Sequence, residues 1–424
     1  MIYTRELYQK FVEKEKLDKI NSTKKRRKRI SSFIRYITFA FLGKKWKWEP
    51  ATLKIKAENI KNILILRYDA IGDYIVTTSA IRWLKDACPH ANIDIVCSER
   101  NKSLAEIDPN VNNIYILPYK KKFWRSLIKI KKQIGNKKYD LTLALVYTKM
   151  TACAILSRCF ASDSEKITIL HTERPHIYGL VFNRQEPSFY PGKSWAERFV
   201  LMMKNNITSN IPIDEKEEKA YICVSKKSLE NISNLLEKHD LSYDLRGKKN
   251  VFSKDDVSNF HRIGKQRYFI INISAYSPNR MWGTNDCSNF IINCLKQYPN
   301  TLFFVSGGPQ FIKETEEIIR TVNHKNCIAL NLPLLDYIAF VGCADLIITP
   351  DTSIAHIGAA FEVPLVILYA EEVKIIDWFP QSERFLPLLS ADKEKLVIKT
   401  EKIIEAVEMI LSDSPIEVCN KIDS

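Results

Sequence analysis

Short runs of apolar residues alternate with amphipathic segments over most of this 424-residue chain. The first run, Ile63–Leu66, leads through a turn with Gly72 into a segment of about 73–85 whose apolar side chains recur at helical spacing. The same alternation predicts strands at 93–97, 113–117, 141–146 and 167–169, and helices at 122–132, 150–159 and 195–204. Strands that alternate with helices indicate a parallel, doubly wound sheet.

A second series of apolar runs predicts another α/β domain further along the chain. Residues 211–265, between the two series, are polar and charged, with a strand expected at 219–224 and helices at 228–239 and 255–263. The strands of the second series are expected at 269–273, 302–305, 327–330, 346–349 and 365–368, and a final helix at 393–411. Short apolar runs of this kind are typical of strands buried on both faces.

The pattern divides the chain into five parts. They are a basic amphipathic extension (1–57), a Rossmann-like domain (58–210), a linker or insertion (211–265), a second Rossmann-like domain (266–390), and a helix with a tail (391–424). We therefore expect an α/β protein with two doubly wound domains and a cleft between them. Ligands of such sheets bind beyond the carboxyl ends of the strands, so polar residues at those ends are the candidates for chemistry.

The net charge of +15 is concentrated near the N-terminus, where residues 1–50 hold 15 basic and 5 acidic side chains. A basic cluster at 24–29 precedes an apolar face at helical spacing and two tryptophans, Trp46 and Trp48. This combination is typical of a helix in a membrane interface, so residues 24–48 are predicted to bind an anionic membrane surface. Docking on the protein's own body is the alternative. Nucleic acid is not an expected partner, because no nucleic-acid-binding motif accompanies the charge.

The sequence also bears on compartment and metal binding. Its first residues lack the apolar core of a signal peptide, and no run of 18 apolar residues occurs. Ten cysteines are scattered without a C-x-x-C pair, which argues against a zinc or iron–sulfur site and favours reduced structural thiols. We expect a cytoplasmic protein, peripheral on the inner face of the membrane, with no metal site.

The turn after Leu66 carries the first candidate site. Asp73 stands at the expected helix N-terminus, which favours an ionised carboxylate that can take a proton from an acceptor hydroxyl. Asp69 competes for this role, and Arg67 at the same edge would hold an anionic acceptor. The alternative is that one or both aspartates only cap the helix.

A second candidate site follows the strand expected at 346–349. The N-terminus of the next helix, expected at 353–361, would bind an anion, and Thr352 and Ser353 add hydroxyl donors. Asp351 and His356 lie beside it, although the first could be a plain helix cap and the second a core residue. A phosphate or diphosphate is the expected ligand.

Two loops at the same sheet edge add further groups. Ser274 and Arg280 follow the strand at 269–273, and an arginine can pair with two phosphate oxygens at once. The alternative is a surface loop with a solvated arginine. Gly307 and Gly308 would let a ligand approach the backbone closely, but an ordinary turn explains two glycines equally well.

Four motifs, taken in order, resemble the heptosyltransferase family of glycosyltransferases, family 9. The family's shared features are an opening strand with a Gly-Asp turn, a basic-x-Trp element, a Gly-Gly-Pro turn and an Asp-Thr/Ser-x-x-x-His signature. The matching stretches are Asn62–Lys85 with Gly72-Asp73, Arg280–Trp282, Ser306–Pro309 and Pro350–His356. The resemblance extends from about residue 61 to 411.

The resemblance implies a GT-B fold that binds an acceptor in the first domain and a nucleotide-sugar in the second, with inversion of the anomeric centre and no metal ion. The residues that fall on the family's functional positions are Asp73 as base, Arg67 near the acceptor, Arg280 at the phosphates, and Asp351, Thr352 and His356 at the donor. Three departures concern the donor side: Ser353 replaces a frequent Gly, Ala370-Glu371 replaces a Gly-Pro, and no acidic residue directly follows the Gly-Gly-Pro turn.

These observations together predict an inverting, metal-independent glycosyltransferase that moves heptose, or a related sugar, from an ADP-sugar to a lipopolysaccharide or other cell-surface glycan. The predicted donor-binding residues are Ser274, Arg280, Gly308, Asp351, Thr352, Ser353 and His356, and the acceptor-binding residues are Arg67, Asp69 and Gly72. No cofactor is expected besides the nucleotide-sugar. The nearest alternative transfers a hexose from another nucleotide-sugar. A Rossmann oxidoreductase is less well supported, because no G-x-G-x-x-G follows Leu66. A noncatalytic protein that kept the fold is the third alternative.

Overall fold

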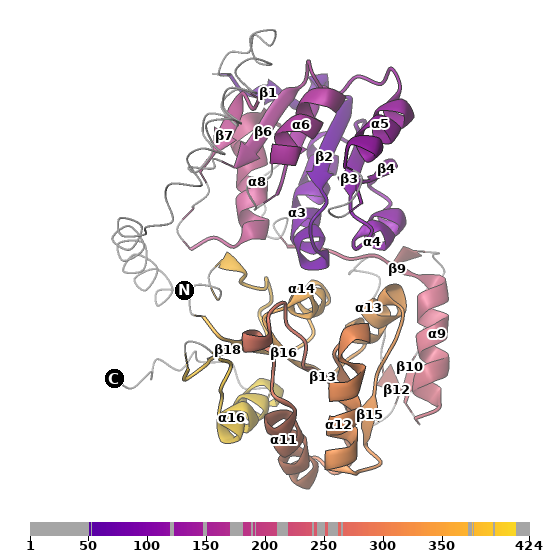
Figure 1. The fold of residues 1–424 in the computed structure, drawn as a ribbon, viewed down its shortest axis with the longest axis vertical. Coiled ribbons are helices and arrows are strands. Elements are labelled where there is room, and N and C mark those ends of the chain that lie inside the picture. The colour runs from indigo at the N-terminus through magenta and orange to yellow at the C-terminus, as the bar shows by residue number, and fades with distance from the viewer. Residues whose placement is uncertain are drawn as a thin grey trace. The chain divides into compact units, whose positions relative to one another are not determined.

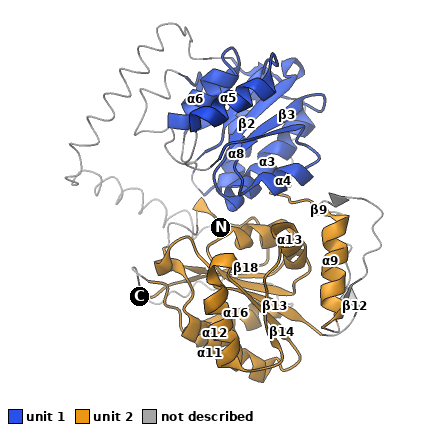
Figure 2. Cartoon of the chain, turned by 45° about the vertical axis from the view of Figure 1, so that its right-hand side comes forward, with its two compact units in different colours: residues 1–219 blue, residues 220–424 orange. Residues whose placement is uncertain are grey.

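The computed structural model describes most of the chain after residue 50 and divides it into two compact units, residues 1–219 and 220–424 (Figure 2). The described residues are 51–412, without those at 52, 119–122, 147–150, 170–180, 188–189, 191, 210–218, 240, 244–250, 253–261, 264–265, 372–374, 376 and 393–394. The predicted membrane-binding segment 24–48 lies outside them. None of the helices in the described part is long and apolar enough to cross a membrane.

The first unit is built on a six-stranded sheet whose paired strands all run parallel (Figure 1). In spatial order the strands are β4 (Asn113–Ile116), β3 (Asn92–Cys97), β2 (Asn62–Arg67), β5 (Leu141–Ala144), β6 (Glu165–Ile169) and β7 (Arg184–Glu186). The helices are α3 (Ile71–Ala87), α4 (Lys102–Ile107), α5 (Phe123–Ile134), α6 (Thr151–Phe160) and α8 (Trp195–Asn206). The described part of the unit also contains a short parallel pair, β1 (Ile55–Lys56) with β8 (Ile207–Thr208), and the 3-10 turn η1 (Ala57–Asn59).

Strand β2 is buried because both of its faces are covered. Leu64 and Leu66 belong to one core with side chains of α5 and α6, while the alternate residues of a strand point to the opposite face. Helix α3 is buried on nearly all sides, since α8 packs against it and the Ser79 hydroxyl donates to the Ala196 carbonyl at 3.2 Å. The predicted apolar stripe of α3 is therefore only part of its buried surface.

The second unit repeats the architecture with another parallel six-stranded sheet. Its strands in spatial order are β15 (Cys327–Ala329), β14 (Leu302–Ser306), β13 (Tyr268–Asn272), β16 (Leu346–Pro350), β17 (Leu365–Tyr369) and β18 (Phe385–Leu389). Its helices are α9 (Lys226–Glu237), α11 (Thr284–Gln297), α12 (Ile312–Val322), α13 (Leu334–Gly342), α14 (Ser353–Ala360) and α16 (Thr400–Leu411), with 3-10 turns η3 (Pro278–Arg280) and η4 (Pro309–Phe311). Two small antiparallel pairs join β9 (Val224–Ser225) to β11 (Val251–Phe252) and β10 (Ser242–Tyr243) to β12 (Arg262–Ile263).

Three sequence predictions about elements need correction. The last helix begins at Thr400 rather than at 393, because the segment before it is held in a loop in which the Leu396 amide donates to the Asn279 carbonyl at 2.8 Å. The strand expected at 219–224 is reduced to β9, since α9 begins immediately after it. The end of the helix expected at 255–263 forms strand β12, and most of that segment lies outside the described residues.

Most of the cysteines in the described part of the chain are buried. The buried set is Cys88, Cys97, Cys153, Cys223, Cys287, Cys294 and Cys327. Burial raises the pKa of the Cys88 thiol to about 11, so this residue acts as a small apolar core group.

Candidate functional site

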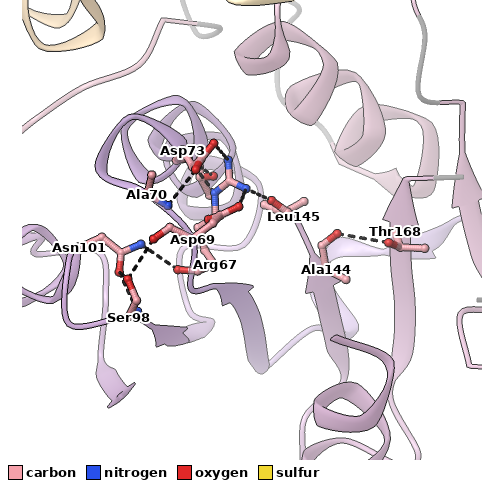
Figure 3. Close-up of polar contacts among 10 residues, drawn as sticks. Arg67, Asp69, Ala70, Asp73, Ser98, Asn101, Ala144, Leu145 and Thr168 are labelled. Atoms are coloured by element: carbon pink, nitrogen blue, oxygen red, sulfur yellow. Dashed lines mark hydrogen bonds and ion pairs between the residues drawn. The ribbon is translucent and has the colours of Figure 1, made fainter. Parts of the chain in front are cut away.

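Arg67, the last residue of β2, is fully buried, and its guanidinium joins three parts of the first unit (Figure 3). Nη1 donates to Asp69 Oδ2 at 3.0 Å and also to the Leu145 carbonyl beyond β5. The cation lies over the Phe199 ring of α8, 5.4 Å from its centroid. The sequence predicted that Arg67 would hold an anionic acceptor, whereas its internal contacts support a role in holding the turn.

Asp73 lies in the first turn of α3, with a side chain that is 14% exposed. Arg67 Nε donates to its backbone carbonyl at 2.7 Å, and Arg67 Nη2 lies 3.9 Å from carboxylate Oδ1. Oδ2 accepts from the Ala70 amide at 2.8 Å and so caps the helix (Figure 3). Capping occupies Oδ2 only, so the carboxylate keeps an oxygen that a hydroxyl could reach.

Asp69 is the second carboxyl group beside Arg67, and its side chain is 12% exposed. Its Oδ1 is buried and makes no hydrogen bond to any residue that the structure describes. One guanidinium faces two carboxylates here, and it cannot neutralise both. Burial raises the pKa of Asp69 to about 7, with Arg67 opposing and the Asp73 charge adding to the rise. At neutral pH the Asp69 carboxyl is thus partly protonated.

Two residues that the sequence did not single out, Ser98 and Asn101, fix this turn from the end of β3. The Ser98 hydroxyl donates to the Asp69 carbonyl at 3.0 Å, and Asn101 Nδ2 donates to the Arg67 carbonyl at 3.0 Å (Figure 3). Asn101 Oδ1 in turn accepts from the Ser98 amide at 2.8 Å. Gly72 is buried in the first turn of α3, as part of the helix rather than of the preceding loop.

We expect the Asp69→Asn variant to lose a pH dependence of stability. The native state holds the Asp69 proton up to about pH 7, whereas the unfolded chain releases it near the ordinary aspartate pKa of 3.8. The wild-type free energy of unfolding should therefore fall as pH rises from about 4 to 7, by at most about 1.4 kcal/mol per pH unit. Denaturant titrations at several pH values, with the exposed Asp163→Asn as control, measure the difference. A parallel pH dependence in Asp69→Asn and wild type would contradict this assignment.

In the second unit, Arg280 of η3 pairs with Asp351, which follows β16. Arg280 Nη2 donates to Asp351 Oδ2 and, at 3.2 Å, to the Asp351 carbonyl. The Tyr369 hydroxyl at the end of β17 is buried and makes no hydrogen bond within the described part of the chain. Burial and the Asp351 charge raise the Tyr369 pKa, while Arg280 opposes the rise. Tyr369 is a site residue that the apolar strand pattern concealed.

A hydrogen-bond network centred on Asn272 joins the ends of β13 and β16. Asn272 Nδ2 donates to Thr349 Oγ1 at 2.8 Å and to Thr352 Oγ1 at 3.2 Å. The Ser274 hydroxyl donates to Asn272 Oδ1 at 2.8 Å. Sequence analysis did not single out Asn272, although a polar residue at the end of an otherwise apolar strand could have indicated it. The network brings Ser274 and Thr352, two predicted donor-binding residues, to one amide.

Helix α14 begins beside this network with its first amides directed toward the same edge. Thr352 is its N-cap residue but makes no side-chain capping hydrogen bond, since its hydroxyl faces Asn272 and Thr349. Ser353 follows as the first helical residue. Uncapped amides and the helix dipole make such an end suited to an anion.

Gly308 lies in the turn between β14 and η4 with φ of +76°, a conformation that favours glycine. A Cβ placed there would meet no atom of the described residues within 4 Å, so space remains beside its backbone. At Gly307 a Cβ would come within 2.6 Å of the Phe311 Cβ. Gly307 is thus required by packing, and Gly308 is the one with room for a ligand.

His356 is buried one turn into α14, with its ring centroid 5.8 Å from that of Trp378. Burial lowers the pKa of His356 to about 4, so the imidazole is neutral at physiological pH. It can donate or accept a hydrogen bond there but offers no positive charge to a phosphate.

A neutral buried histidine predicts acid sensitivity. In the unfolded chain the His356 imidazole is protonated below its ordinary pKa of 6.5, whereas in the native state it stays neutral down to about pH 4. As pH falls from about 6.5 to about 4, the wild-type free energy of unfolding should therefore decrease by at most about 1.4 kcal/mol per pH unit. The His356→Gln variant should lack this decrease. Thermal unfolding at about pH 7.5 and at about pH 5 tests it, with the exposed His90→Gln as control. Equal acid destabilisation of His356→Gln and wild type would show that His356 is not the residue responsible.

The described residues contain no group of three or more His, Cys, Asp or Glu side chains placed to hold a metal ion. Each sheet thus presents polar groups of a different kind at its carboxyl edge. The first offers the carboxylates Asp69 and Asp73 around a buried arginine, and the second offers a helix N-terminus, hydroxyls and Arg280.

A family model and a curated relative place the chain among known proteins. A model of glycosyltransferase family 9 (heptosyltransferase) matches residues 127–384, more than half of the chain. Lipopolysaccharide heptosyltransferase 3 of Escherichia coli is 23% identical over 369 residues, which cover 81% of this chain and 96% of the relative. Asp73 lies outside the range that the family model matches, so the role of Asp73 as the base stays a prediction.

Solved structures support the fold. A glycosyl transferase family 9 structure from Veillonella parvula has a TM-score of 0.66 at 17% identity, covering 84% of this chain and 98% of that one. E. coli heptosyltransferase WaaC with ADP has a TM-score of 0.61 at 13% identity, covering 82% and 99%. The two parallel sheets are those of a GT-B fold, as the sequence predicted. The chain belongs to glycosyltransferase family 9, the heptosyltransferase family.

Proposed function

We propose that this glycosyltransferase moves heptose, or a related sugar, from an ADP-sugar to a lipopolysaccharide or other cell-surface glycan acceptor. The proposal is supported by the family description, by the relative named lipopolysaccharide heptosyltransferase 3, and by the structure of WaaC with ADP. The observation that carries it is the pair of carboxyl-edge sites, one with an accessible carboxylate and one suited to an anion.

Asp73 is assigned as the general base. An inverting transfer needs a carboxylate that accepts the proton of the acceptor hydroxyl while that oxygen attacks the anomeric carbon. Asp73 Oδ2 is held by the Ala70 amide, and its backbone carbonyl is held by Arg67, so the group is fixed before the acceptor binds. Such preorganisation reduces the cost of reaching the transition state. Arg67 is thus a positioning residue, which holds the Asp73 backbone through a hydrogen bond inside the protein.

The second unit is assigned to the leaving nucleoside diphosphate. Negative charge develops on the diphosphate as the sugar bond breaks, and fixed donors aimed at that charge lower the barrier. Arg280, the amides at the start of α14 and the backbone at Gly308 supply these donors without a divalent cation. Asp351 orients Arg280 before the diphosphate arrives.

Residues 24–48 are assigned to an anionic membrane surface, where a lipid-linked acceptor would lie on the cytoplasmic side. Removal of residues 1–50 should lower binding to anionic vesicles while turnover on a soluble acceptor is kept. Unchanged vesicle binding after the deletion would remove this assignment.

A donor screen tests the proposed function. Purified protein is incubated with an acceptor glycan and ADP-, GDP- or UDP-sugars, and the release of nucleoside diphosphate is measured with the Asp73→Asn protein as background. The proposal expects the fastest release from ADP-heptose. A preference for a UDP-hexose would support glycosyl transfer but would show that the donor is not ADP-heptose. No release from any donor would favour a noncatalytic protein.

A further inference from the structure

Helix α5 of the first unit presents large apolar side chains on its outward face. Ser126, Ile130 and Ile134 are buried against the sheet, whereas Trp124 is 66% exposed and Ile128 is 56% exposed. Trp124 and Ile128 are four residues apart and so lie on one face of the helix. A surface helix normally keeps this face polar, so the pair requires another explanation.

The same face of α5 is strongly basic. The exposed cations around the two apolar residues are Arg125, Lys129, Lys131 and Lys132, and the helix contains no acidic residue. The longer stretch 109–139 holds nine Lys and Arg and no Asp or Glu, so it contributes +9 to the net charge of +15 of the whole chain. We call Trp124, Arg125, Ile128, Lys129, Lys131 and Lys132 the α5 patch.

The position of α5 in the sheet relates the patch to Asp73. Helix α5 connects β4 to β5 in a sheet whose strands all run parallel, so it begins beyond the carboxyl end of β4. Arg67 and Asp73 stand at the carboxyl end of β2 in the same sheet. Trp124, in the first turn of α5, therefore lies at the sheet edge that carries the proposed base.

We propose that the α5 patch binds the surface of an anionic lipid bilayer, with Trp124 and Ile128 at the level of the headgroups and the flanking cations on lipid phosphates. Tryptophan favours the boundary between apolar and aqueous phases, and lysine stems cover apolar surface while their charges reach outward. A basic face with exposed aromatic and aliphatic side chains is the composition of interfacial helices.

Charge decides between a membrane and other occupants of the patch. Residues 1–50 carry a net charge of +10, so the N-terminal segment would be repelled from it, and a second copy of the patch would be repelled likewise. A polyanion such as nucleic acid would satisfy the cations but leave Trp124 and Ile128 against water or phosphates. A bilayer satisfies both parts. The inference does not depend on the proposed reaction, because binding is measured without turnover.

The test measures sedimentation of the full chain with vesicles of phosphatidylcholine, alone or mixed with phosphatidylglycerol. Two patch variants are compared, Trp124→Ser with Ile128→Ser and Lys129→Gln with Lys132→Gln. The matched control is Met409→Ser, an exposed apolar residue of α16 that neighbours Glu405 and Glu408. Each protein is also made with the basic residues 24–29 replaced by glutamine, so that the N-terminal segment cannot mask a loss.

We expect each patch variant to weaken binding to the anionic vesicles at least about tenfold, with the control unchanged. The lysine variant should also bind with less dependence on salt than wild type. The substituted positions in α5 and α16 are exposed, so donor turnover with a soluble acceptor should be retained. Wild-type affinity in both patch variants would overturn the inference, as would vesicle binding that does not require anionic lipid. Altered self-association without altered vesicle binding would assign the patch to a protein contact instead. Absence of turnover in a wild-type protein that still binds anionic vesicles would count against the proposed function alone.

Discussion

Replacing Asp73 by asparagine should lower kcat for glycosyl transfer by about 10³-fold, within the 10²–10⁴ range for loss of a general base. The amide keeps the shape of the side chain, and its oxygen can still accept from the Ala70 amide, so α3 should remain capped. What is lost is a group that takes up the acceptor proton. Single-turnover rates with purified acceptor, together with the Kd of the donor, measure the effect; the donor Kd should be unchanged.

Asp69→Asn is the matched control for this experiment, because the two carboxyl groups share one arginine. Asp69 Oδ1 is buried and its carboxyl is partly protonated at neutral pH, so its amide variant should retain transfer within about tenfold of wild type. If Asp69→Asn is the inactive variant and Asp73→Asn is active, the assignments of the two aspartates must be exchanged.

Arg280→Met should be the second most damaging substitution. It removes a guanidinium from the edge assigned to the diphosphate and leaves Asp351, with an 11% exposed side chain, without its cation. Loss of one donor that stabilises developing charge typically costs about 10²–10³-fold in kcat. The affinity for the nucleoside diphosphate should fall as well, since it carries the same charge as the leaving group.

Calorimetric titration of ADP and steady-state kinetics separate these two effects. Arg280→Lys should recover part of the affinity but not the paired geometry that a guanidinium offers to phosphate oxygens. Arg320→Met, which changes an exposed arginine of α12, is the control. Wild-type ADP affinity in Arg280→Met would remove this residue from the donor site.

The parts of the fold that the sequence predicted are those governed by local patterns. Central parallel strands are continuous apolar runs, so β2, β13 and β16 could be placed within one or two residues. Two of the four edge strands, β4 and β15, were also predicted, whereas the other two, β7 and β18, gave no such signal. Strand β7 has three residues, and β18 contains Pro387, which is tolerated because β18 lies at the edge of its sheet.

The candidate site was predictable only as far as position along a strand determines it. Asp73 and Arg280 follow strands and were identified in that way. The burial of Arg67 was not, because its contacts to Leu145 and Phe199 join residues far apart in sequence. Tyr369 resembled an ordinary strand residue, since only the fold brings its hydroxyl under the influence of the Asp351 and Arg280 charges.

The anomeric configuration of the first product tests the account most directly. If the Asp73 carboxylate activates the acceptor for direct displacement of the diphosphate, nuclear magnetic resonance of the product of a short incubation should show a sugar linkage inverted relative to the donor. A linkage with the donor's own configuration would require a different mechanism, and would contradict the role that we assign to Asp73.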